Sequence, residues 1–182
     1  MSLTAQLNVT PDGFCNHADV VVDEQFNAFA VQCLEEADRL LLGRKTFDLF
    51  AGHWPRAAKY ASLPEGEQRL ARAIDDIEKL VISRSLSESD WKPTSILSDF
   101  DEPAARSLSR SGRTIVLGSP SIISQLAAWG ALDRLMLSVH PVMGQKGARL
   151  FDGLVPKTLV FEREFPSGSS VRTYVFAAAP SP

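Results

Sequence analysis

Two cations and a hydroxyl follow a short apolar run, Leu40–Leu42, in the segment that continues from Gly43 to Phe47. The run predicts a buried strand, and the glycine marks the point where the chain turns directly into a helix. A glycine at such a turn lets a ligand approach the main chain closely. The free N–H groups of the new helix, with Arg44 and Lys45 beside them, suit a phosphate. The segment therefore indicates a nucleotide ligand.

Two further strand ends carry polar residues of the same kind. In an open α/β sheet, ligands bind at the carboxyl ends of the strands, so we expect all three sets at one edge. Glycines, hydroxyls, cations and helix N-termini together can hold a dinucleotide that carries an extra phosphate. The two further sets follow Ile82 and Leu117, and they are Ser83-Arg84-Ser85 and Gly118-Ser119-Pro120-Ser121.

Each motif alone also has a simpler structural explanation. Gly-Ser-Pro after a strand is a device that caps a helix, and Ser-Arg-Ser after a strand is commonly a solvated loop. The sequence contains neither the dinucleotide fingerprint Gly-x-Gly-x-x-Gly nor the phosphate loop Gly-x-x-x-x-Gly-Lys-Ser/Thr. A nucleotide site in this chain would therefore belong to another architecture.

Other kinds of chemistry have little support. The three histidines, His17, His53 and His140, lack metal-ligand spacing, and we expect no metal and a structural role for His140. No Gly-x-Ser-x-Gly elbow of a hydrolase occurs. Two cysteines are too few for a disulfide framework, so we expect reduced thiols in a cytoplasmic protein, with Cys33 in the core and the role of Cys15 open.

Size and composition fit one soluble domain over residues 1–182. Hydrophobic residues make up 45% and charged residues 23% of the 182 residues, which is ordinary for a globular protein. The net charge of -3 argues against nucleic acid or an anionic membrane as partner. No apolar run approaches the length of a membrane span, and no signal peptide is evident.

Strand-like and helix-like segments alternate along the chain. This repetition predicts an α/β fold with a mainly parallel sheet, helices on both faces and a C-terminal antiparallel hairpin. The stretch between Gly52 and Gly66 is expected to be irregular. Helices are expected after Asp23, after Gly43, over Gly66–Ile77, from Asp101 to near Gly112, and from Ser119 as N-cap to Gly130. Strands are expected at Leu7–Val9, Leu40–Leu42, Lys79–Arg84, Ser95–Leu97, Thr114–Gly118, Leu135–Val139, Thr158–Phe165 and Val171–Ala177.

The three motifs, in this order, resemble the dihydrofolate-reductase-like family. Within it they are similar to the reductase domain of the riboflavin-biosynthesis deaminase-reductase and its stand-alone relatives. The runs Gly130–Leu135, His140–Gly144 and Gly147–Phe151 add to the resemblance, which extends from about Leu7 to Phe176. It implies a three-layer fold with a mixed sheet of about eight strands.

The resemblance also implies a cofactor, NADPH, in an extended pose. Val9 and the Gly13–Asn16 loop would flank the nicotinamide. Residues on the cofactor's phosphates would be Gly43, Arg44, Lys45, Thr46, Ser83, Arg84, Ser85, Gly118, Ser119, Pro120, Ser121 and Ile122. For the wall of a substrate site we name Phe14, Asn16, Phe26, Asn27 and Phe47, for each of which core or loop packing is an equal alternative.

Two departures from the family pattern leave two hypotheses open. Paired glycines are common where this chain has Gly118-Ser119, and dihydrofolate reductases carry a carboxylate near the place of Asn27, which cannot supply a proton in that way. The first hypothesis is an NADPH-dependent reductase of a flat heterocycle such as a pyrimidine, pteridine or flavin-like compound. The second is a non-catalytic nucleotide-binding or dimerising module of the same fold. The resemblance also implies a homodimer.

Overall fold

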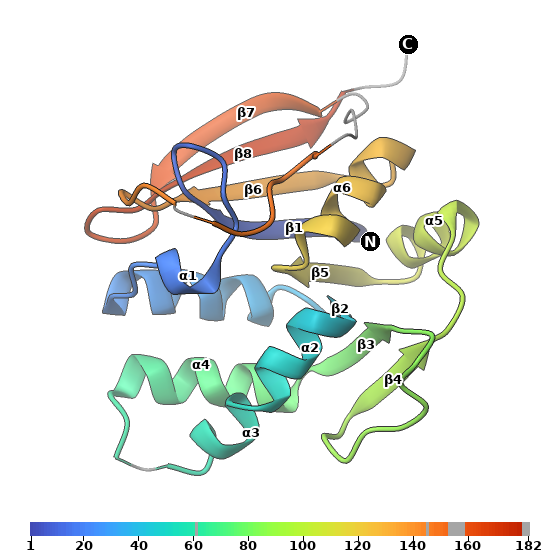
Figure 1. Cartoon of the computed structure of the whole chain (residues 1–182), viewed down its shortest axis with the longest axis horizontal. Helices are drawn as coiled ribbons and strands as arrows, with labels where there is room; N and C mark the ends of the chain where they lie inside the picture. Colours follow the sequence, from blue (N-terminus) through green and yellow to red (C-terminus); the bar gives the residue numbers. More distant parts are fainter. Residues whose placement is uncertain (61, 145, 153–158, 180–182) are drawn as a thin grey trace.

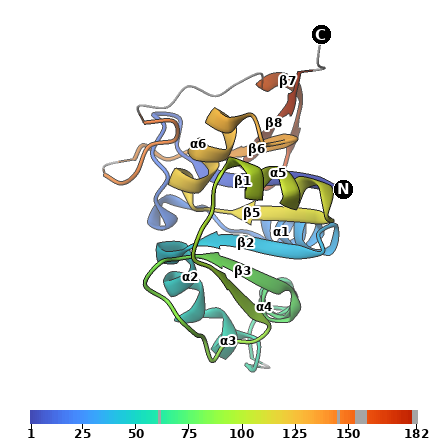
Figure 2. The same ribbon diagram turned by 90° about the vertical axis from the view of Figure 1, so that its right-hand side faces the viewer.

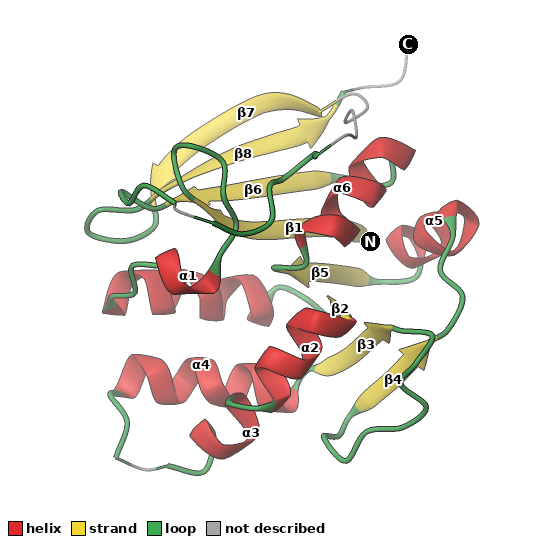
Figure 3. Ribbon diagram, viewed as in Figure 1, coloured by secondary structure: helices red, strands yellow, loops and turns green. Residues whose placement is uncertain are grey.

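The protein folds around one eight-stranded mixed sheet with helices on both of its faces (Figures 1 and 3). The computed structural model describes residues 1–60, 62–144, 146–152 and 159–179. The order across the sheet is β4-β3-β2-β5-β1-β6-β8-β7. The strands are β1 (Ser2–Val9), β2 (Arg39–Gly43), β3 (Glu78–Ile82), β4 (Thr94–Leu97), β5 (Arg113–Leu117), β6 (Arg134–Val139), β7 (Leu159–Pro166) and β8 (Arg172–Ala178).

All strands from β4 across to β6 are parallel to their neighbours, whereas β8 runs antiparallel to both β6 and β7. The helices lie on the two faces of the sheet when it is viewed from its end (Figure 2). They are the 3-10 helix η1 (His17–Asp19) and the α-helices α1 (Glu24–Glu35), α2 (Arg44–Ala51), α3 (Trp54–Ala57), α4 (Glu65–Asp76), α5 (Glu102–Arg110) and α6 (Pro120–Trp129).

The sheet separates two hydrophobic cores, and strand β2 contributes to both. Leu41 belongs to the core beneath α5 and α6, whereas Leu40 and Leu42 belong to the core beneath α1 and α4. Successive side chains of a strand point to opposite faces, so a strand covered on both sides must be apolar throughout. All three leucines are 0% exposed, which explains the continuous apolar run in the sequence.

Short-range signals fix the ends of several helices as the sequence predicts. The Asp23 carboxylate accepts a hydrogen bond from the N–H of Phe26 at the start of α1, and Asp101 does the same for Ala104 at the start of α5. Gly130 ends α6 with a left-handed φ of 65°. No helix in the described part of the chain is both long and apolar enough to cross a membrane.

The fold class is confirmed, and the differences are local. The short helix α3 occupies part of the stretch predicted to be irregular, where Pro55 stands in its first turn. Strand β1 begins at Ser2, five residues before the predicted Leu7, because it pairs with both β5 and β6 in the middle of the sheet. The predicted strand start at Thr158 lies outside the described residues.

Candidate functional site

The three polar segments predicted to share an edge follow neighbouring strands. Strand β2 lies between β3 and β5, and all three are parallel. Gly43 is paired with Ile82, the last residue of β3, and Leu41 with Val116 of β5. The turns after Gly43, Ile82 and Leu117 therefore open at the same carboxyl edge of the sheet.

The side chain of Ser119 joins two of these turns. Its Oγ accepts a hydrogen bond from the Gly43 N–H at 2.9 Å and donates to Thr46 Oγ1 at 2.9 Å. The residue adopts a left-handed backbone, with φ 57°, and it makes no side-chain cap to α6. Ser119 is the N-cap by position, as predicted, but its hydroxyl holds the β2–α2 turn instead of the helix that it begins.

Close contact between the same two turns accounts for both glycines. A Cβ on Gly43 would lie 3.2 Å from Ile122 Cγ1 and 3.4 Å from Ser119 Oγ, and a Cβ on Gly118 would lie 3.3 Å from Thr46 Cγ2. Gly118 also has a φ of 60°, which side chains disfavour. From the sequence, Gly43 is expected to let a ligand approach the main chain, whereas in the structure the neighbouring turn approaches it.

Cations and hydroxyls cluster around the β3 and β2 ends. Arg44 Nε lies 2.8 Å from both carboxylate oxygens of Asp48, and its Nη1 is 3.5 Å from Ser85 Oγ. The buried hydroxyl of Ser83 accepts hydrogen bonds from the N–H groups of Ser85 and Leu86, so it shapes the turn. Lys45 and Arg84 are exposed at this edge.

This donor set fits the phosphates of a dinucleotide. No side chain caps the N-terminus of α2 or α6, so first-turn N–H groups such as that of Ser121 are not taken by a capping side chain, whereas the Ile122 N–H donates to the Ser119 carbonyl. Helix N-termini carry a partial positive charge, to which Lys45 and Arg84 add two full charges, while the charge of Arg44 is shared with Asp48. The Gly43 N–H is the exception, because Ser119 already accepts its hydrogen bond.

The five residues named for a substrate wall do not all lie together. Phe47 is 4% exposed and stacks on Trp91 in the core at a centroid distance of 5.8 Å. Asn27 faces the start of α4, and a Cβ added to Gly66 of that helix would lie 3.7 Å from the Cβ of Asn27. Phe26 instead presents its ring to His140, with centroids 5.1 Å apart.

Phe14 and Asn16, together with Val9, lie at a small pocket beyond the carboxyl end of β1. The lining residues are Asn8, Val9, Thr10, Phe14, Asn16, Asp19, Val20 and His140. Of these eight residues the sequence indicated Val9, Phe14 and Asn16 as site residues and missed the other five, among them Asp19 and His140, the latter predicted to be structural. The place of His140 in the chain could have indicated this pocket, because the residue directly follows β6. The last residue of β6, Val139, pairs with Val9 of β1.

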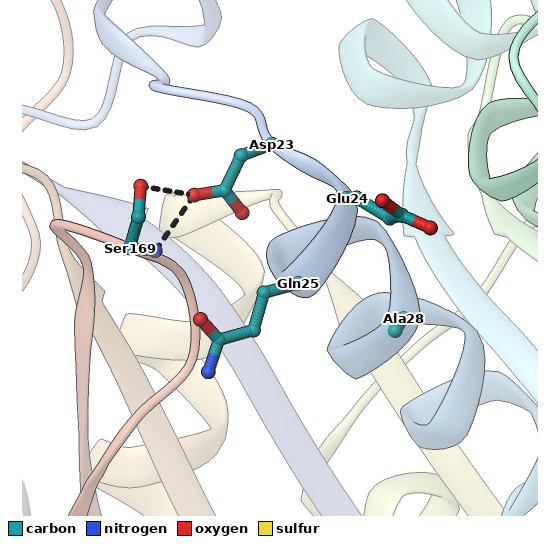
Figure 4. Close-up of a pocket in the computed structure, with 5 residues that line it drawn as sticks. All are labelled: Asp23, Glu24, Gln25, Ala28 and Ser169. Carbon is teal, nitrogen blue, oxygen red and sulfur yellow. Dashed lines mark hydrogen bonds between the residues drawn. The ribbon is translucent and has the colours of Figure 1, made fainter.

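A larger open groove lies at the start of α1, beside the β7–β8 turn (Figure 4). The polar contact between Asp23 and Ser169 at this groove is structural: Asp23 Oδ2 accepts hydrogen bonds of 2.6 Å from both the N–H and the hydroxyl of Ser169 (Figure 4). Since the Asp23 carboxylate also caps α1, it ties the hairpin to the helix. These bonds hold the pKa of Asp23 below its usual value.

The strand order, the antiparallel C-terminal hairpin and the polar turns at the carboxyl edge define a dihydrofolate-reductase-like fold. The chain belongs to the family described as the RibD C-terminal domain, which matches residues 2–167. This confirms the resemblance inferred from the motifs.

Comparisons with individual proteins are consistent with this family assignment. The uncharacterized protein YyaP of Bacillus subtilis is 30% identical over 173 residues, which span 89% of this chain and 88% of YyaP. A putative riboflavin biosynthesis protein from Shewanella sp. PV-4 superposes with a TM-score of 0.68 at 15% identity, over 97% of this chain and 98% of that one. Dihydrofolate reductase from Enterococcus faecalis, solved with NADP(H) and RAB-propyl, gives 0.63 at 14% identity, over 97% and 95% of the two chains. At these identities the two superpositions establish the fold alone.

Proposed function

We propose that the protein is an NADPH-dependent reductase of a small flat heterocycle, of the pyrimidine, pteridine or flavin-like class. The observation that carries this proposal is the convergence of three polar turns at the carboxyl ends of β3, β2 and β5. Membership of the RibD C-terminal domain family supports it. The solved relative from E. faecalis, with the same fold, was complexed with NADP(H).

The chain's own residues would bind and orient the cofactor. The first turns of α2 and α6, with Arg44 and Lys45, would hold the pyrophosphate, and Arg84 with Ser85 would hold the 2′-phosphate. Val9 and the Gly13–Asn16 loop would flank the nicotinamide. The bound cofactor would supply the hydride, so the protein's contribution is orientation and exclusion of water.

Calorimetric titration with NADPH and with NADH tests the cofactor assignment. We expect NADPH to bind more tightly, because NADH lacks the 2′-phosphate that Arg84 would contact. Failure of both nucleotides to bind at up to about 1 mM would contradict the proposal. A homodimer belongs to the same proposal, and light scattering should give twice the 19.9 kDa of one chain.

A non-catalytic nucleotide-binding module is the second candidate. Two observations favour it: Asn27 offers no acidic proton and faces α4, and Ser119 occupies the Gly43 N–H. Oxidation of NADPH, followed by its absorbance in the presence of pyrimidines, pteridines and flavins, distinguishes the two. NADPH binding without consumption on any of these compounds would favour the module.

A further inference from the structure

The loop that follows β1, residues 12–16, is held by a second loop, residues 147–151. An isolated antiparallel bridge joins Phe14 to Arg149. The side chain of Arg149 adds two contacts, because its Nη1 donates to the Asp12 carbonyl at 3.0 Å and its guanidinium carbon lies 4.1 Å from the centroid of the Phe14 ring. A guanidinium in this position is attracted to the face of the ring. Arg149 therefore holds the 12–16 loop through both its main chain and its side chain.

Gly144 provides the space that the Phe14 ring occupies. A Cβ added to Gly144 would lie 2.7 Å from both the Cβ and the Cδ2 of Phe14, which is closer than side chains pack. The φ of Gly144 lies outside the left-handed region, so its backbone does not require a glycine. The Gly144 N–H also donates to Asp12 Oδ1 at 3.0 Å. A glycine at this position is therefore explained by the close packing of Phe14.

The second loop is attached in turn to α6, whose first turn lies at the carboxyl edge of the sheet. The Phe151 N–H donates to Ser124 Oγ at 2.9 Å, and this hydroxyl donates to the carbonyl of Pro120, the first residue of α6, at 2.8 Å. Ser124 is buried, and Phe151 packs against the core beneath α5 and α6. These contacts connect the 12–16 loop to the start of α6.

The 12–16 loop lies where the nicotinamide half of an extended dinucleotide would end. Leu117, the last residue of β5, pairs with Gln6 of the parallel strand β1. Val9 lies three residues further along β1, which places it roughly 10 Å beyond that pair. A pyrophosphate at the start of α6 would therefore direct the nicotinamide toward the end of β1 and the loop that follows it.

We propose that Arg149 is a positioning residue, which holds the 12–16 loop in the conformation that contacts the nicotinamide half of the cofactor. The inference rests on the proposed function, because it takes NADPH as the ligand, and it adds a residue outside the three phosphate turns. Without Arg149 the cofactor itself would have to order the loop, so binding of its nicotinamide half would be less favourable. The adenosine half, at the three strand ends, would bind as before.

Calorimetric titration with NADPH and with 2′,5′-ADP tests this role, because 2′,5′-ADP carries the adenosine and its phosphates but no nicotinamide. In Arg149→Ala we expect the affinity for NADPH to fall at least about fivefold and the affinity for 2′,5′-ADP to stay within about twofold of the parent. Gly144→Ala should give the same selective loss, because its Cβ would displace Phe14 and leave the phosphate turns untouched. Arg149 is exposed, so its removal leaves the core intact.

Each variant has a matched control that should leave both affinities unchanged. Arg172→Ala also removes an exposed arginine with a hydrogen bond, in this case to Glu164. Gly66→Ala also adds a Cβ to a glycine, but there the Cβ would make ordinary contacts at 3.7 Å.

Equal losses for the two ligands, or no loss of NADPH affinity in either loop variant, would overturn the inference. Thermal melting identifies a variant that does not fold, and the other loop variant then decides. The two proposals fail differently. A parent protein that binds neither ligand would remove the cofactor and the role of Arg149 with it, whereas a parent that binds both, with no selective loss in the variants, would remove only the role of Arg149.

Discussion

Ser119 holds two strand-to-helix turns together with one hydroxyl group while its backbone is left-handed. Ser119→Ala keeps the unfavourable backbone and leaves the Gly43 N–H without its partner, so we expect a loss of about 1–3 kcal/mol in unfolding free energy. Ser119→Gly loses the same hydrogen bonds but adopts the left-handed conformation freely, so it should cost less. Urea unfolding of both variants measures the difference.

The same two variants report on the cofactor. Ser119→Gly frees the Gly43 N–H and removes a Cβ between the two turns, so we expect NADPH to bind several-fold more tightly than in the parent. Calorimetry on Ser119→Gly and Ser119→Ala provides the measurement. Weaker NADPH binding by the glycine variant, with the fold intact, would mean that Ser119 itself contacts the cofactor.

A second prediction for a single residue concerns Arg84. It is exposed at the end of β3, and among the described residues its side chain makes no hydrogen bond or ion pair. Arg84→Ala should therefore leave stability unchanged and reduce NADPH affinity about tenfold, with little effect on NADH. Arg110→Ala, at the exposed end of α5, is the matched control. An unchanged preference for NADPH in Arg84→Ala would remove this residue from the site.

Single residues were the hardest to place from the sequence. The residue types at 43–46, 83–85 and 118–121 indicated one sheet edge correctly, because strand ends follow from local patterns. The contact of Phe47 with Trp91 and the direction of Asn27 depend on helices α2 and α1 docking against distant segments. The contact of Arg149 with Phe14 joins two loops that are far apart in the sequence.

At the level of elements, Asp38 and Arg113 link the start of β2 to the start of β5. The Asp38 carboxylate accepts bonds from the N–H of Arg113 at 2.8 Å and from its Nη2 at 2.6 Å. These bonds lower the pKa of Asp38 from 3.8 to about 2. Because the folded-state pKa lies below the unfolded one, the stabilisation is present above about pH 4 and is lost as the pH falls toward 2.

Asp38→Asn should therefore be less stable than the parent at pH 7, and the difference should shrink between pH 4 and pH 2. Thermal melting across this range measures it, with Asp90→Asn as an exposed control. A difference that stays constant down to pH 2 would show that the charge of Asp38 does not stabilise the pairing.

Lys79 terminates α4 from inside the core. Its Nζ donates to the carbonyls of Ile74, Asp75 and Ile77 at 3.1, 2.7 and 2.8 Å, and it lies 4.5 Å from the ring centroid of Trp91. Burial lowers its pKa to about 8, so the amine is charged at pH 7. All three of its donors serve structure.

Lys79→Met fills a similar volume and leaves three carbonyls unpaired, so we expect a loss of about 2–4 kcal/mol in unfolding free energy at pH 7. Urea unfolding measures this. NADPH affinity at a temperature where the variant is folded should not change, and a selective loss of NADPH binding with unaltered stability would contradict the structural role.

Elements were more predictable than side chains. Continuous apolar runs gave β2, β3 and β5, and aspartate caps gave the starts of α1 and α5, because these signals act within a few residues. The full length of β1 was not predicted, since Ser2–Gln6 are held by pairing with β5 and β6 on either side. Helix α3 is one turn long and too short to show a helical period.

For the whole molecule, the alternation of strands and helices was enough to predict a mainly parallel sheet, and the motifs in order indicated the family. The fold places β3, β2 and β5 side by side, and this brings the segments that follow Gly43, Ile82 and Leu117 to one edge of the sheet. The central claim is that this edge binds the phosphates of NADPH.

Amide chemical shifts of the 15N-labelled protein, followed as NADPH is added, test that claim most directly. We predict saturable shifts concentrated in residues 43–46, 83–85 and 118–122, with a smaller response to NADH at 83–85. Shifts confined to other regions, such as the groove between Asp23 and Ser169, or no saturable shifts in the three strand-end segments, would contradict it.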